Sequence, residues 1–176
     1  MKINLQIENN IFSLGHRALA SALSEITDIP ENKELFDQLA SHPSTFVKRE
    51  VACKENLGKR TFETLVCSAD SDIVLSLLRG KGVSRHLNEK HLKALIASNN
   101  YEVLEYLACQ IEDFDISSNS EEGLFFINHA DPGIRLTLAR NTQAPKTMLR
   151  QLTKDEDPDV QSEAIDSLAI GDRLFK

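Results

Sequence analysis

The sequence predicts an all-α protein, an α-solenoid in which about five two-helix repeats stack as a superhelix behind an N-terminal capping helix. Two columns of apolar residues recur along the chain, and each column has a helical spacing. Strict alternation of apolar and polar residues, the pattern of a strand, is confined to Ile3–Ile7. Units of this length that are helical in both halves indicate stacked helix pairs.

The first column follows a turn, and its clearest copy lies at residues 129–141. Asp131 and Pro132 suit the start of a helix, since aspartate can accept a hydrogen bond from the first turn and proline has no N–H to leave unpaired there. Ile134 and Leu138, four residues apart, then share one face. The equivalent positions, at steps of 27, 29, 31 and 26 residues, are Val47, Val74, Val103, Ile134 and Val160.

The second column precedes the first in every copy. It consists of apolar pairs spaced three residues apart, which is also a helical spacing. These pairs are Phe36/Leu39, Phe62/Leu65, Leu92/Leu95, Leu124/Ile127 and Leu149/Leu152. Each repeat is therefore predicted to contain two short helices joined by a turn.

The ends of the chain do not follow the repeat pattern. Residues 1–10 are expected to be a loose lead-in, and residues 12–27 carry the stripe of an amphipathic helix that would cap the first repeat. We therefore expect one domain, with the lead-in and cap at 1–29, the repeats at 30–170 and a C-terminal tail at 171–176.

The motif Asp-Pro-x-Ile-Arg-x-x-Leu-Ala-x-Asn at 131–141, with a second copy at 42–52, resembles the leucine-rich repeat variant family. The resemblance implies a HEAT-like α-solenoid in which one segment of each repeat is often short and 3₁₀-like. Some members hold an iron–sulfur cluster on an N-terminal cysteine-rich segment. Here no cysteine precedes Cys53, so no cofactor is expected.

Composition narrows the class of partner. The formal net charge is −7, whereas a nucleic-acid binder needs a basic face, so nucleic acid is not expected as a partner. Residues 1–6 lack the apolar core of a signal peptide, and no apolar run is long enough for a membrane span. Three unpaired cysteines, Cys53, Cys67 and Cys109, are expected to be buried and reduced, as in a cytoplasmic protein.

No residue is assigned a catalytic, metal-binding or cofactor-binding role. Asp155, Asp157 and Asp159 have the spacing of a calcium loop, but Val160 stands where that loop needs glycine, so an acidic turn is the better interpretation. His42 and His129 occupy the same turn position, which a repeated structural hydrogen bond explains better than a metal. A distant cysteine–histidine pair is left open.

In each repeat, the residue that follows the leading Val or Ile of the first column indicates which side chains face the solvent. It is polar in the clear copies and leucine in the two central ones. Leu75 and Leu104, with Tyr106, therefore either form an exposed apolar patch, or pack differently or under the loop at 112–122. Arg135 and Arg140 are expected to reach water. These five residues are the candidate partner-binding set.

The favoured hypothesis is a non-enzymatic cytoplasmic scaffold that binds another protein through its repeats. A HEAT-like enzyme or nucleic-acid-processing module is the alternative, and a domain that only dimerises is a third possibility. A deep pocket with converging ionisable groups, or a continuous basic groove, would favour the alternative.

Overall fold

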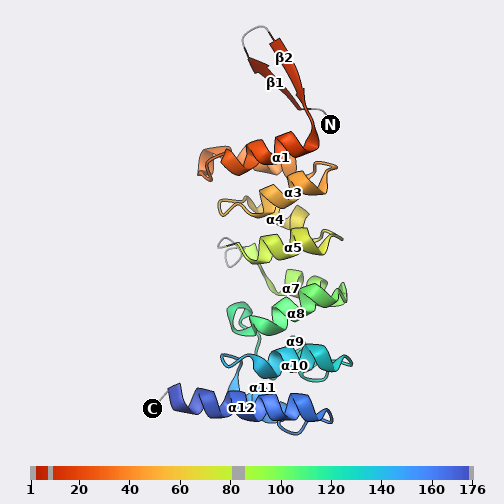
Figure 1. Cartoon of the computed structure of the whole chain (residues 1–176), viewed down its shortest axis with the longest axis vertical. Coiled ribbons are helices and arrows are strands. Elements are labelled where there is room, and N and C mark those ends of the chain that lie inside the picture. Colours follow the sequence, from red (N-terminus) through yellow and green to blue (C-terminus); the bar gives the residue numbers. More distant parts are fainter. Residues whose placement is uncertain (1–2, 8–9, 81–85, 175–176) are drawn as a thin grey trace. The chain divides into compact units, whose positions relative to one another are not determined.

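The structure, a computed structural model, describes residues 3–7, 10–80 and 86–174 (Figure 1). The chain divides into two compact units, Met1–Leu92 and Lys93–Lys176. Apart from a hairpin at the N-terminus, the regular structure of the described residues is helical, and neighbouring helices pack on one another. This confirms the helical class. No helix in the described ranges has both the length and the apolar character needed to cross a membrane.

The N-terminal segment is a β-hairpin rather than a loose lead-in. Strand β1 (Ile3–Ile7) pairs antiparallel with β2 (Asn10–Leu14), and Ile3 lies opposite Leu14. The alternation in Ile3–Ile7 is the period of a strand, and β2 supplies its partner. The first helix therefore begins at His16 rather than at residue 12, directly after Gly15 in an extended conformation.

The first unit continues with two layers of short helices. Its helical elements are α1 (His16–Glu25), η1 (Pro30–Asn32), α2 (Lys33–Ala40), α3 (Thr45–Ala52), α4 (Lys59–Val66) and α5 (Ser71–Leu78). Helix α3 packs between α1 and α5, while α2 and α4 contact each other and pack on α3 and α5. Isolated helices this short are marginal in water, so their stability comes from this packing.

The second unit has the same organisation. After α7 (Glu89–Ala97), which crosses the boundary between the units, come α8 (Tyr101–Cys109), η2 (Ile111–Phe114), α9 (Glu121–Ile127), α10 (Pro132–Arg140), α11 (Lys146–Leu152) and α12 (Pro158–Leu174). Helix α10 packs against both α8 and α12, and α11 contacts α9 and α12. Both segments of the repeats are α-helical, so the 3₁₀ character implied by the family resemblance is wrong for them. Helix α12 continues into the tail expected at 171–176, and Phe175 and Lys176 lie outside the described residues.

Side-chain caps define where several helices begin. The Asp131 carboxylate accepts a hydrogen bond from the N–H of Gly133, as expected from the Asp-Pro turn. Asp70, Asn100, Ser120 and Asp157 accept equivalent bonds before α5, α8, α9 and α12. Each cap satisfies a backbone donor that the helix itself leaves unpaired.

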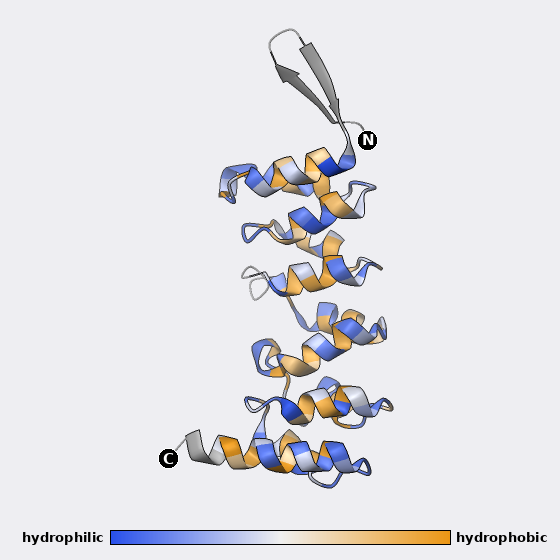
Figure 2. Cartoon of the chain, in the orientation of Figure 1, coloured by the Kyte–Doolittle hydropathy of each residue, from blue (hydrophilic) through white to orange (hydrophobic). Residues whose placement is uncertain are grey.

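The first apolar column forms the core, as expected. Val47, Val74, Val103, Ile134 and Val160 are all buried. In Figure 2, the hydrophobic residues alternate with hydrophilic ones along the helices, which is the pattern of a helix with one buried face.

The second apolar column differs from the prediction in α9. Leu124 is exposed, whereas Phe126 is fully buried, so the repeat frame in this helix is shifted by one residue. Gly123 occupies the position that Phe36 and Phe62 hold in their own helices. A Cβ atom there would collide with the carbonyl oxygen of Ser117 and come within 2.9 Å of the Met148 Cε. Backbone therefore fills the space that an aromatic ring fills elsewhere.

Candidate partner-binding surface

The apolar patch considered for Leu75 and Leu104 is not on the surface. Leu75 is 8% exposed and Leu104 is 1% exposed, so the alternative in which these leucines pack inward is confirmed and the exposed patch is wrong. Five of the eight residues of α5 are apolar, and all five are buried, namely Ile73, Val74, Leu75, Leu77 and Leu78. The position after the leading valine faces inward because these helices bury a wider arc than the clear copies indicate.

Tyr106 is half-buried beside the turn that follows its helix. Its ring centroid lies 6.4 Å from that of Phe114 in η2, in an edge-on arrangement. The start of the loop at 112–122 therefore covers Tyr106, which agrees with the alternative in which this loop covers the central residues.

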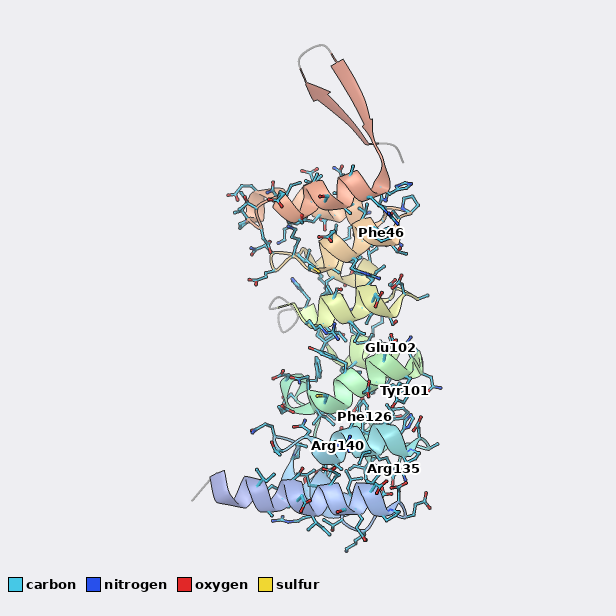
Figure 3. All side chains as sticks on the ribbon, in the orientation of Figure 1. Phe46, Tyr101, Glu102, Phe126, Arg135 and Arg140 are labelled. Atoms are coloured by element: carbon cyan, nitrogen blue, oxygen red, sulfur yellow. The ribbon has the colours of Figure 1, made fainter. Side chains whose placement is uncertain are left out.

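Arg135 is buried, contrary to the expectation that it reaches water. Its Nε and Nη2 each donate to a different oxygen of Asp155 at 2.8 Å, and its Nη1 donates to the carbonyl oxygen of His129 at 2.6 Å. These hydrogen bonds hold the pKa of Asp155 below its usual range and raise that of Arg135. The guanidinium joins α10 to the turn before α12, so we assign it a structural role (Figure 3).

Arg140 is exposed, as expected. Its Nη2 lies 3.2 Å from the Glu163 Oε1, and the two side chains are 61% and 38% exposed. Exposed ion pairs contribute little to stability, so Arg140 stays available to a partner. It is the member of the candidate set whose side chain lies most openly on the surface.

The two turn histidines make the same hydrogen bond, as expected. The backbone N–H of Ser44 donates to the Nδ1 of His42, and that of Asp131 donates to the Nδ1 of His129, both at 3.1 Å. Each histidine therefore supports the turn before a helix of the first column. This repeated bond assigns both residues a structural role.

The acidic turn at 155–159 also has structural partners. Asp155 pairs with Arg135, and Asp157 caps α12 by accepting from the N–H groups of Asp159 and Val160. Among the side chains that the structure describes, no group of three or more His, Cys, Asp or Glu residues is arranged to hold a metal ion. All three cysteines are free, but they are exposed rather than buried.

A pocket between α7 and α9 was not anticipated from the sequence. It has a volume of about 470 Å³, and its lining includes Ile96, Ala97, Glu121, Glu122 and Phe125. The sequence feature that could have indicated this pocket is the pair of glutamates before the apolar run at 124–127. The sequence did not show which residues of that run face outward, because the repeat frame of α9 is shifted by one residue.

An exposed tyrosine lies elsewhere on the second unit. Tyr101, at the start of α8 in Figure 3, is 46% exposed. Its hydroxyl group lies over Gly133, where it would approach an added Cβ to 2.8 Å. Partial burial, followed by the charges of Glu105 and Asp131, raises the pKa of this phenol. An aromatic ring and two carboxylates thus meet between α8 and α10.

The two units differ sharply in charge. Residues 1–92 contain twelve basic and twelve acidic residues, whereas residues 93–176 contain eight basic and fifteen acidic residues. The whole formal net charge of −7 therefore belongs to the second unit. Comparison with protein-family models, curated proteins and solved structures gives no match.

Proposed function

We propose that the protein is a non-enzymatic α-solenoid, HEAT-like and related to the leucine-rich repeat variant family, that binds another protein in the cytoplasm. The burial of the first apolar column supports the repeat alignment, since one position per repeat packs inward in both units. Stacked repeats expose the remaining helix faces, which can vary without disturbing the core. Free, exposed cysteines suit a reducing compartment.

The observation that carries the proposal is the surface of the second unit. It combines an excess of carboxylates with large apolar side chains that stay exposed, namely Tyr101, Leu124, Ile165 and Ile170. Apolar groups at the surface of a charged protein are typical of binding sites. An acidic surface also repels nucleic acid and attracts basic partners.

The test is affinity capture from nuclease-treated native lysate, followed by mass spectrometry and by reconstitution with the purified partner. The wild type is compared with Tyr101→Ser/Ile165→Ser on the second unit. The matched control is Phe46→Ser, which removes an aromatic side chain 49% exposed on the first unit. Circular dichroism confirms that the variants fold.

We expect a protein partner that the double variant loses and the control retains. Recovery of the same background by all three proteins would contradict the scaffold function. Recovery of nucleic acid in a parallel capture without nuclease, or of further copies of this chain alone, would favour the alternative functions instead.

A further inference from the structure

Apolar side chains from both helices form much of the wall of the pocket between α7 and α9. Ile96 and Ala97 come from α7, and Phe125 comes from α9. The neighbouring Asn99 is in the left-handed conformation, with φ at 48°, and turns the chain away from α7. A volume of about 470 Å³ is within the range of pockets that take up ligands.

One wall of this pocket carries a carboxylate that lacks a hydrogen-bond donor. The Glu122 side chain is 11% exposed, and within the described residues its Oε1 is buried with no hydrogen-bond partner. The Lys93 Nζ lies 3.8 Å from this oxygen, which is beyond hydrogen-bond distance. Buried carboxylate oxygens are rarely left in this state, because losing water without gaining a donor is unfavourable.

Lys93 does not neutralise this site. The same ammonium lies 3.7 Å from the Glu121 Oε2, so two carboxylates share one cation. Among the described residues that line the pocket, two carboxylates and one ammonium leave one excess negative charge, and the unit that contains them has a net charge of −7. A ligand that carries a positive charge and hydrogen-bond donors therefore complements it.

We infer that this pocket receives a basic side chain of the protein partner, and arginine in preference to lysine. This inference rests on the proposed function. The aliphatic stem of the arginine packs against Ile96 and Ala97, and the guanidinium donates to Glu122. The face of a guanidinium also stacks on an aromatic ring such as Phe125, and its planar fork matches the geometry of a carboxylate. An ammonium group provides neither feature.

The inference is tested with a blocked pentapeptide, Gly-Gly-Arg-Gly-Gly, titrated into the ¹⁵N-labelled full chain. Citrulline in place of arginine keeps the shape and removes the charge, and lysine keeps the charge and removes the fork. We expect the amide signals of Ile96, Ala97 and Phe125 to shift with the arginine peptide. Affinity should fall by about fivefold or more with citrulline, because the charged hydrogen bonds are lost. Equal binding of the arginine and citrulline peptides, or no shifts at these residues, would overturn the inference.

The chain provides a matched pair of variants. Glu121→Gln and Glu122→Gln remove the same charge from adjacent residues that share Lys93, but Glu121 is 86% exposed. We expect Glu122→Gln to lower the affinity for the arginine peptide by about fivefold. Glu121→Gln should lower it by less than about twofold, since the exposed charge is screened. Equal losses would show a general charge effect and overturn the inference. Thermal melts confirm that both variants fold.

Lysate capture with the Glu122→Gln variant separates this inference from the proposed function. If wild type captures a partner and Glu122→Gln captures it equally well, the scaffold function stands and the inference fails. If wild type captures no partner, the scaffold function fails, and the peptide titration decides the pocket by itself. Loss of the partner in Glu122→Gln, with retention in Glu121→Gln, supports both.

Discussion

The buried ion pair between Arg135 and Asp155 provides the sharpest stability prediction. Both side chains are almost fully buried, at 7% and 6% exposed. Asp155→Ala leaves the guanidinium charge buried, and removing one partner of such a pair costs about 3–5 kcal/mol. We expect the low end, about 3 kcal/mol, because Arg135 keeps the His129 carbonyl and a pocket of about 400 Å³ beside it admits water.

The control is Glu163→Ala, which breaks the exposed pair with Arg140. The same unit thus contains a buried and an exposed ion pair, both involving α10. The exposed pair should contribute about 0.5 kcal/mol. A third variant, Asp155→Ala/Arg135→Met, should be more stable than Asp155→Ala alone, since it also removes the uncompensated charge.

The assay is urea unfolding followed by tyrosine fluorescence. The chain has no tryptophan and two tyrosines, Tyr101 and Tyr106, and both lie in the second unit. The signal therefore reports the unit that holds both ion pairs, and linear extrapolation gives the free energy of unfolding. A loss below about 1 kcal/mol for Asp155→Ala, or equal losses for Asp155→Ala and Glu163→Ala, would refute the assigned structural role.

Three further predictions concern the second unit. Gly123→Ala should lower the free energy of unfolding by about 1–3 kcal/mol, because its Cβ meets the Ser117 carbonyl; an unchanged melting temperature would contradict this close approach. Leu138→Ala should cost about 2–4 kcal/mol and the exposed Ile165→Ala less than about 0.5 kcal/mol in urea unfolding, and similar losses would contradict the repeat alignment. The lowered pKa of Asp155 stabilises the fold above the ordinary carboxyl pKa of 3.8, and this contribution is lost as the pH falls through the pKa of the folded protein. The free energy of unfolding, measured at pH 7 and at about pH 3, should therefore change less with pH in Asp155→Asn than in wild type.

Local patterns were sufficient to predict the helical class and the buried positions of the first apolar column. Val47, Val103 and Ile134 could be placed because burial of one helical face requires only apolar residues at the right spacing. Asp131 could be identified as a cap for a similar reason, since a cap bonds to a backbone group two or three residues away. These interactions lie within one turn of a helix and are visible in the sequence.

The accessibility of individual side chains was not predictable in this way. Leu75 and Arg135 occupy the same column position, and the sequence indicates only that one is apolar and the other charged. Arg135 is buried because Asp155, twenty residues further along the chain, accepts two of its hydrogen bonds. Leu75 is buried because its helix packs on more than one neighbour.

The glutamates of the α7–α9 pocket illustrate the same limit. Glu121 and Glu122 are adjacent, identical in type and paired with one lysine, yet one is exposed and the other almost buried. Residue type and spacing decided the helical class, the first apolar column and the caps, because these features depend on local backbone geometry. Burial of a charge depends instead on which donors and which walls the fold brings around it. Packing between helices distant in sequence thus decided which leucines lie inside, which arginine is structural and where the pocket opens.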